Sequence, residues 1–306
     1  MLVDISLMPK YGNICGYTEE NINREFKEHI DSEKDIQNMR EWYNGYWFLK
    51  DKVYNPFDVL QYLDNKTLKN YWFMSGNPSF LIKLIEEKKY FLPNLSNLTI
   101  DAKLLDVFDI DRINIEVLLY QTGYLTIEEA NELTFGGTEY RLGFPNKEVK
   151  TSFGDIIIEY LVGTKATNAK KDIYKSLITA DINGFINTLK STFATIPYTE
   201  SEHIKKYEGF YASIVFAYLQ ALGINITGEG ITNKGRIDIT CFMGDKTYIM
   251  EFKVMKSKRE KGSALAQIKE KKYYEKYAGG GKEIYIVGME FSEEEKNIVN
   301  FEWERV

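Results

Sequence analysis

The chain has 306 residues, enough to bury one large or two ordinary hydrophobic cores, and we expect two domains. Its formal net charge of −6 excludes a polyanion-binding surface spread over the whole protein, so a nucleic-acid surface would have to be local. Cys15 and Cys241 lack metal-ligand spacing, which excludes a zinc site built on cysteines and favours free thiols in a reducing compartment.

In chain order, the first half of the sequence predicts mainly helices. It starts without a basic and then apolar leader, and no apolar run reaches membrane-spanning length, so we expect a cytoplasmic protein outside the membrane. Residues 124–127 and 140–144 read as two strands around a glycine-containing loop, and with the preceding helix they resemble the wing of a winged-helix unit. Helices are predicted over 18–49, 55–65, 70–88 and 114–120, and then over 150–200 with breaks at Asn183-Gly184 and Pro197.

The second half predicts a different order, helix, three strands, helix and strand. The predicted elements are a helix over 204–222, a strand over 224–227, a hairpin over 236–254, a helix over 264–277, a strand over 283–288 and a final helix from Ser292.

The hairpin GRIDITCFMGDKTYIMEFKV, residues 235–254, is the stretch most suggestive of chemistry. Gly244-Asp245 suits a two-residue type II′ turn, in which Met243 faces Lys246. Counting back from that turn puts Asp238 opposite Glu251 and Arg236 opposite Lys253, with all four side chains on one face. Carboxylates placed directly across a sheet repel each other unless a cation lies between them, which favours a divalent metal.

The alternative for these four residues is an exposed sheet face with paired charges, which is what most charged strand residues form. The hydrophobic neighbours of Glu251 in YIMEF favour a partly buried acid instead, because a solvated strand does not need them.

A local basic run follows the hairpin. Nine Lys or Arg and three Glu lie between Lys253 and Lys276. Within it, Gln267, Lys271 and Tyr274 would share one helical stripe suited to facing a nucleic-acid backbone. A solvated helix face is the alternative for this run. The aromatic residues of the first half are better explained by core packing than by base stacking.

Asp238 and then Glu251-Phe252-Lys253, set in an αβββαβ order, resemble the PD-(D/E)XK nuclease superfamily. The segments KYEGFYASIVFAYLQALG, GEGITNKGRIDI, YIMEFK, ALAQIKEKKYYEKY and EIYIVGMEF resemble the nuclease domain that follows an AAA-ATPase-like domain in bacterial proteins. The resemblance implies an α+β or α/β protein with a restriction-endonuclease-like core at 201–306, a helical connector at 166–200 and a mainly helical N-terminal domain at 1–165 with the small winged element.

The resemblance also implies the roles of single residues. Asp238 and Glu251 would bind Mg²⁺ or Mn²⁺ together with the Phe252 carbonyl, and Lys253 would orient or activate the attacking water. The remaining roles are Glu208 as a further metal-binding acid, Gln267 as the glutamine of the helix after the sheet, and Arg236, Lys256, Lys258, Lys271 and Tyr274 as DNA contacts. Relatives linked to helicases carry Tyr four positions after the Gln, where this chain has Lys271, so Gln267 is favoured over either later tyrosine.

The first half resembles the distal part of the ATPase-like domain through CGYTEENI, WYNGYWF, VYNPFDVLQYL and LGFPNKEV. Fuller family members carry a P-loop upstream of these motifs, whereas no phosphate-binding glycine loop occurs in this sequence. The sequence is compatible both with a naturally short protein and with a shortened one.

The sequence therefore predicts a Mg²⁺-dependent nuclease that hydrolyses DNA phosphodiester bonds with a metal-activated water. Two alternatives remain open, a non-catalytic module that binds DNA or a partner, and a nuclease subunit of an ATP-driven complex whose motor lies on another chain. DNA is the expected partner, and an ATPase or a second copy of the chain is a candidate partner.

Overall fold

The computed structural model describes residues 5–76, 78–105, 114–163, 166–196, 208–232, 235–255 and 261–306. The chain divides into an N-terminal unit, residues 1–81 and 97–152, and a C-terminal unit, residues 82–96 and 153–306. The sequence-based domains at 1–165, 166–200 and 201–306 remain a prediction. The compact units divide at Ser152 and Phe153, and they place residues 82–96 with the C-terminal part of the chain.

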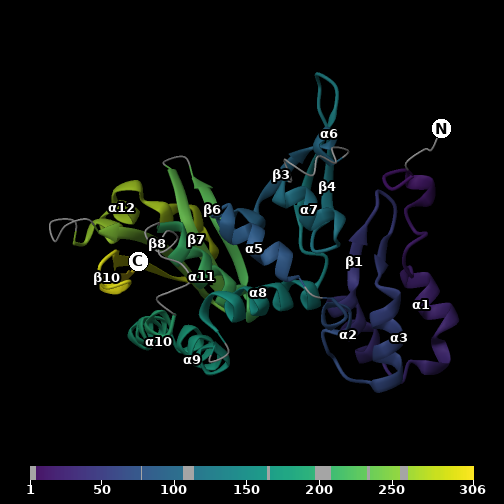
Figure 1. Cartoon of the computed structure of the whole chain (residues 1–306), viewed down its shortest axis with the longest axis horizontal. Coiled ribbons are helices and arrows are strands. Elements are labelled where there is room, and N and C mark those ends of the chain that lie inside the picture. Colours follow the sequence, from purple (N-terminus) through teal and green to yellow (C-terminus); the bar gives the residue numbers. More distant parts are fainter. Residues whose placement is uncertain are drawn as a thin grey trace. The chain divides into compact units, whose positions relative to one another are not determined.

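The N-terminal unit is mainly helical and holds two small sheets (Figure 1). One sheet pairs β1 with β2, and the other has the order β3-β5-β4. The helices of this unit are η1 (Pro9–Tyr11), α1 (Glu19–Glu25), η2 (Lys27–His29), α2 (Glu33–Tyr43), α3 (Pro56–Asn65), α4 (Tyr71–Met74), α6 (Ala102–Leu105) and α7 (Ile115–Gln121), while α5 (Ser79–Glu87) and α8 (Lys147–Val162) cross the unit boundary. The strands are β1 (Asn44–Trp47), β2 (Lys52–Tyr54), β3 (Leu98–Asp101), β4 (Thr126–Glu132) and β5 (Thr138–Gly143).

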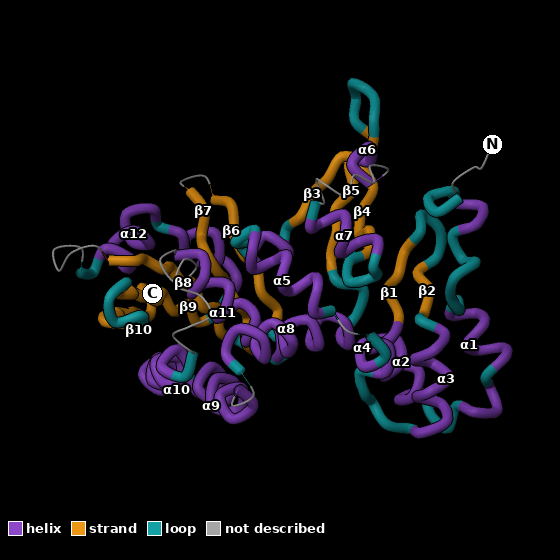
Figure 2. Tube along the Cα trace, viewed as in Figure 1, coloured by secondary structure: helices purple, strands orange, loops and turns teal. Residues whose placement is uncertain are grey.

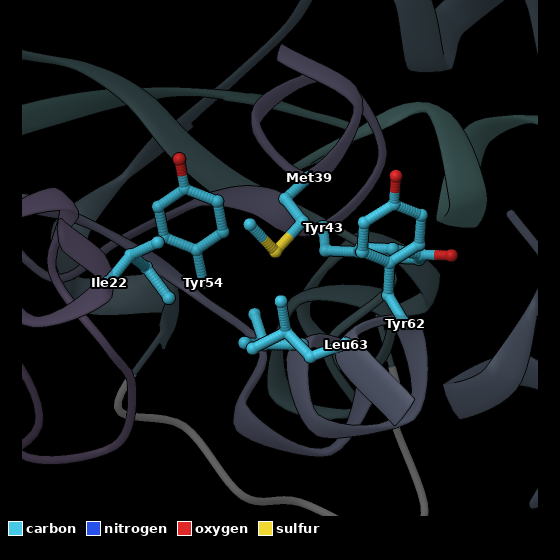
Figure 3. Packing of buried hydrophobic residues seen from close by; sticks show 7 residues of the cluster. Ile22, Met39, Tyr43, Tyr54, Tyr62 and Leu63 are labelled. Carbon is cyan, nitrogen blue, oxygen red and sulfur yellow. The ribbon is translucent and has the colours of Figure 1, made fainter. Parts of the chain in front are cut away.

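Side chains from α1, α2, β2 and α3 form the core of the first part of this unit. Figure 3 shows the labelled members gathered around the Met39 side chain. The buried tyrosines keep their hydroxyls paired, since Tyr43 donates to the Lys69 carbonyl at 3.0 Å and Tyr62 donates to Asp35 at 2.9 Å. These aromatic residues therefore pack in a core, as the sequence indicated. The buried cluster consists of Ile22, Met39, Tyr43, Tyr54, Val59, Tyr62 and Leu63.

The predicted helix over 18–49 is wrong in extent. It is interrupted after α1 and ends at Tyr43, because the aromatic segment that follows forms β1. Gly45 has φ 130 beside a register shift in the β1–β2 pairing, and a Cβ there would meet the Pro145 carbonyl oxygen at 1.8 Å. Only glycine fits this bulge.

The small winged element is present as a helix followed by a hairpin. Asn114 caps α7 by accepting hydrogen bonds from the amides of Glu116 and Val117, and β4 and β5 then pair antiparallel. The strand β3 pairs with the other edge of β5, and this strand was not predicted.

Two buried acids meet beneath α4 in the N-terminal unit. Asp58 accepts a hydrogen bond from the Trp72 amide at 2.8 Å, and Glu148 accepts one from the Phe73 amide at 3.2 Å. Asp58 and Glu148 are 1% and 0% exposed, and their carboxyl groups lie close enough to interact electrostatically. Burial raises the pKa of Glu148 well above its usual range, and the neighbouring Asp58 charge raises that pKa further. Glu148 therefore keeps its proton in the folded protein at neutral pH.

The C-terminal unit is built on a five-stranded sheet with the order β10-β9-β8-β7-β6 (Figure 2). The pair β8–β9 is parallel and the other pairs are antiparallel, so the chain must cross over between β8 and β9, and α12 lies in that crossover. The strands are β6 (Asn225–Thr232), β7 (Gly235–Met243), β8 (Lys246–Met255), β9 (Glu283–Ser292) and β10 (Asn297–Arg305). The helices are η3 (Leu92–Ser96), α9 (Ala166–Thr179), α10 (Ile182–Ala194), α11 (Glu208–Ala221), α12 (Ser263–Lys271) and η6 (Tyr273–Gly280).

Alternate residues of β8 face opposite sides of this sheet. Tyr248 donates to the Leu177 carbonyl in α9 at 2.5 Å, so Tyr248 and the alternate residues that point the same way face α9. Ile249 packs with Leu265 and Ile268 of α12 on the other face. The sheet thus has a helical layer on both sides, and α12 covers the face that carries Glu251.

The outer edge of β6 is closed by η3, from residues 82–96 of the chain. Ser96 Oγ accepts a hydrogen bond from the Gly228 amide at 2.6 Å and donates to the Gly228 carbonyl at 3.4 Å. A Cβ at Gly228 would meet Pro93 at 2.3 Å, so the two segments are in direct backbone contact.

Two predicted boundaries in the C-terminal unit are wrong. Residues after Ser292 form β10 rather than a final helix, and β10 pairs antiparallel with β9 after a turn in which Lys296 has φ 52. Asn183-Gly184 lies inside α10, whose start is set by Asp181 accepting a hydrogen bond from the Gly184 amide at 2.9 Å. Otherwise the αβββαβ order is confirmed, with β10 added at its end.

The buried Asp58–Glu148 pair predicts a pH-dependent stability for the N-terminal unit. The folded state keeps the Glu148 proton to a higher pH than the unfolded chain, because burial and Asp58 raise the pKa of Glu148 when the protein folds. The unit should therefore be most stable at acidic pH and lose stability as the pH rises through this raised pKa. Glu148→Gln should flatten that dependence between pH 6 and pH 9, measured as the urea midpoint of tryptophan fluorescence in a Trp303→Phe background, which leaves Trp42, Trp47 and Trp72 of the N-terminal unit.

The matched control is Glu132→Gln, which makes the same change on the exposed end of β4. Its urea midpoint should follow that of the wild type at both pH values. An equally steep loss of stability in Glu148→Gln and the wild type would contradict a proton held at this position.

Candidate nuclease site

The hairpin turn has the predicted geometry. Met243 pairs with Lys246, and the pairing continues in register from there to Ile239 and Met250. Gly244 has φ 59, as the first central residue of a type II′ turn requires. Asp238 and Glu251 are the next residues along the two strands, directly beyond the last pair of this ladder.

The Asp238 side chain bonds to the backbone of β8 next to Glu251. Its Oδ2 accepts a hydrogen bond from the Phe252 amide at 2.9 Å. This bond fixes the orientation of the Asp238 carboxylate and holds β7 and β8 together where the register of backbone pairs ends.

Glu251 is a buried carboxylate on the α12 side of the sheet, only 2% exposed. Lys253 follows two residues later on the same face, and its Nζ lies 3.9 Å from Glu251 Oε1. The Lys253 side chain is 31% exposed, so it reaches from the buried acid toward solvent. A buried charge with a nearby cation costs far less free energy than an isolated one.

Gln267 of α12 supplies the second contact to this acid. Its Nε2 donates a short hydrogen bond to Glu251 Oε1, the same oxygen that faces Lys253. The helix brings Gln267 over the sheet because Leu265 and Ile268 of the same helix pack into the hydrophobic layer with Ile249.

Tyr273 also belongs to this cluster, although the sequence reasoning set it aside. Its ring is buried among the residues between α12 and the sheet. Burial raises the pKa of Tyr273, the nearby charges of Glu251 and Asp238 raise that pKa further, and a hydrogen bond with Gln267 opposes them. Lys272 has φ 49 and ends α12, and this left-handed residue turns Tyr273 back toward Gln267. A lysine gives no signal for such a turn, so the sequence could not place Tyr273 here.

The close approach of α12 to the sheet depends on Gly288 of β9. Gly288 is the parallel neighbour of Glu251. A Cβ at this position would meet the Leu265 amide nitrogen at 2.4 Å and Leu265 Cα at 2.9 Å. The missing side chain therefore lets the helix lie directly on the strand beside Glu251.

The remaining predicted site residues either lie apart from this cluster or have side chains outside the described residues. The predicted stripe of Gln267, Lys271 and Tyr274 is wrong as a single helix face, because α12 ends at Lys271 and Tyr274 lies in η6, packed against the hydrophobic layer. Arg236 pairs through its backbone with Ile231 of β6, and its side chain lies outside the described residues. The side chain of Glu208, the first residue of α11, is also outside them, as are Lys256 and Lys258 entirely.

The donor set of the site suits a hard divalent cation held partly by its substrate. Within the described ranges, no group of three or more His, Cys, Asp or Glu side chains is gathered closely enough to hold a metal ion. Mg²⁺ does not need such a group, since it is commonly bound through one or two carboxylates together with waters and substrate phosphates. The oriented Asp238 and the buried Glu251 provide two oxygen donors of that kind.

Comparison with known proteins finds a family match within the C-terminal unit. Residues 206–301 match the model of the PD-(D/E)XK nuclease superfamily, and this segment, with its mixed helical and sheet fold, is a domain of that superfamily. The chain is 35% identical over 304 residues to an uncharacterized protein in the vnfD 5′ region of Azotobacter chroococcum mcd 1, covering 98% of this chain. The chain spans 58% of the length of that relative. No solved structure matches the chain. None of the helices in the described part of the chain is long and apolar enough to cross a membrane.

The contact between Gly288 and α12 predicts the effect of adding one methyl group. Gly288→Ala should displace α12 and destabilise the C-terminal unit by about 1–3 kcal/mol, because the new Cβ would overlap helix backbone that cannot rotate away. The measurement is urea unfolding followed by circular dichroism.

Gly279→Ala is the matched control, because a Cβ at Gly279 would meet no atom within 4 Å. Its unfolding midpoint should equal or slightly exceed that of the wild type. An unchanged midpoint in Gly288→Ala would contradict the direct helix-on-strand packing.

Proposed function

We propose that this protein is a metal-dependent deoxyribonuclease that hydrolyses phosphodiester bonds at the site of Asp238, Glu251 and Lys253. The observation that carries the proposal is the buried Glu251 carboxylate, which faces Lys253 at 3.9 Å, accepts from Gln267, and lies beside the oriented Asp238. The superfamily match supports nuclease activity, and superfamily members typically use divalent metals. DNA as the substrate and Mg²⁺ or Mn²⁺ as the metal are part of the proposal.

Asp238 and Glu251 would hold the metal, with the Phe252 carbonyl as a further oxygen ligand. A bound divalent cation would lower the pKa of an attacking water and offset the charge that builds on the phosphate. Gln267 keeps Glu251 oriented by donating to one of its oxygens. Glu208 is proposed as the additional acid.

Lys253 is proposed to orient the attacking water and to stabilise negative charge on the scissile phosphate. Its exposed fraction of 31% leaves the ammonium group partly open to an incoming ligand, while Glu251 limits the directions in which it can lie. A fixed cation at this position costs little reorganisation when the phosphate arrives.

The DNA backbone would be held by the basic residues around the site. Lys271 lies at the partly exposed end of α12, and Arg236, Lys256, Lys258 and Tyr274 complete the proposed contacts. For the N-terminal unit, the motifs that resemble an AAA-ATPase-like domain support a remnant of such a domain, with any ATP hydrolysis supplied by another chain.

The test incubates the protein with supercoiled plasmid and with linear single- and double-stranded DNA, in Mg²⁺, in Mn²⁺ or in EDTA. Cleavage should require the metal. Asp238→Asn should lower the cleavage rate at least about 100-fold, because a lost metal ligand removes several kcal/mol of transition-state stabilisation.

The control for charge is Asp245→Asn, which makes the same change at the exposed hairpin turn and should cleave at the wild-type rate. Cleavage that persists in EDTA or in Asp238→Asn would overturn the proposed mechanism. Tight DNA binding with no cleavage in any metal would instead identify a non-catalytic binding module.

A further inference from the structure

A second buried glutamate lies next to the proposed site on the neighbouring strand. Glu290 of β9 is 1% exposed and is the parallel neighbour of Lys253 in the register of β8 and β9. Neighbours in register point to the same side of a sheet, so Glu290 and Lys253 share the face covered by α12. The superfamily motif does not include this residue.

The Glu290 carboxylate binds the beginning of α12 rather than the lysine beside it. Oε2 accepts from the Gly262 amide at 2.9 Å and from Asn300 Nδ2 at 2.8 Å. Oε1 accepts from the Ala264 amide at 3.2 Å and from Ser263 Oγ at 3.3 Å. Both carboxylate oxygens are thus engaged by neutral hydrogen-bond donors.

These bonds replace a cap that the helix sequence lacks. Gly262 stands at the N-cap of α12 with φ 84, and glycine has no side chain that could bind the free amides of the first turn. Glu290 reaches them from a strand 28 residues away in the chain. A carboxylate there satisfies the amide donors and also interacts favourably with the positive end of the helix dipole.

The same helix carries Gln267, one turn beyond the residues that Glu290 holds. The position of the helix start therefore decides whether Gln267 Nε2 reaches Glu251. Because the Glu290 carboxylate is bonded to the start of α12, the acid that faces Lys253 is Glu251, whose Oε1 lies 3.9 Å from Lys253 Nζ. Two buried carboxylates on neighbouring strands thus have different partners although they lie on one face.

We propose that Glu290 is a positioning residue of the nuclease site, which fixes the start of α12 so that Gln267 holds Glu251 in its metal-binding orientation. The expected effects on metal binding and on DNA cleavage rest on the proposed function. The expected effect on the start of α12 is independent of it.

The test is Glu290→Gln, which keeps the size of the side chain but turns an amide group toward the amide donors of α12. Hydrogen exchange over residues 261–271 should become faster than in the wild type. Mn²⁺ affinity, measured by calorimetry, should fall about 10- to 100-fold, as is typical when a group that orients a metal ligand is lost. The kcat for DNA cleavage should fall over the same range while KM for DNA changes less than about twofold.

The matched control is Glu302→Gln. Glu302 is an exposed acid of β10, and its carboxylate oxygens would lie 3.5 Å from a Cβ at Gly262. The substitution therefore makes the same chemical change near the same helix start. It should leave hydrogen exchange, Mn²⁺ affinity and kcat unchanged. If Glu290→Gln does not fold, Asn300→Ala removes only one donor to the carboxylate and should shift the same three quantities in the same direction by a smaller amount.

Unchanged exchange and unchanged Mn²⁺ affinity in a folded Glu290→Gln protein would overturn the positioning role. A wild-type protein that neither binds Mn²⁺ nor cleaves DNA would instead overturn the proposed function. In that case, hydrogen exchange alone would still decide whether Glu290 fixes the start of α12.

Discussion

The C-terminal unit depends on the burial of one negative charge, the Glu251 carboxylate. Moving a carboxylate out of water is costly unless hydrogen-bond donors or a cation replace the water. Here a glutamine donor comes from α12 and a cation comes from Lys253 on the same strand. The helix can provide that donor only because Gly288 lets it lie against the sheet. The hydrogen bond to Glu251 therefore depends on the packing of α12 on β9.

Three buried acids in this protein show how the surroundings decide what a carboxyl group does. Glu148 keeps its proton because it is buried, and the charge of the neighbouring Asp58 raises its pKa further than burial alone. Both carboxylate oxygens of Glu290 accept hydrogen bonds from amides at the start of α12, and these bonds hold the helix in place. Glu251 faces a lysine and a glutamine side chain next to a second, oriented carboxylate, and such a set is the one suited to a metal ion.

The sequence reached the site through local patterns. The Gly-Asp turn set the register of the hairpin, and strand alternation then put Glu251 and Lys253 on one face. The features that the sequence did not predict depend on contacts between residues far apart in the chain, or on backbone torsions that the residue type does not indicate. Tyr273 reaches the site through the left-handed Lys272, and Glu290 caps a helix that begins 28 residues earlier. The last strand was mistaken for a helix because Ser292 and the three glutamates after it resemble a helix start, whereas the following residues pair with β9 as a strand.

The closure of the β6 edge by η3 bears on what counts as one domain in this chain. Ser96 and Pro93 lie on the strand at Gly228, although residues 97–152 of the N-terminal unit separate them in sequence from the rest of the C-terminal unit. An isolated fragment that begins at residue 201 would leave the backbone groups of that strand uncovered, and open strand edges promote association between chains. The C-terminal unit is therefore discontinuous in sequence, and a version of it in a single piece would need residues 82–96 joined to residue 153 by a linker.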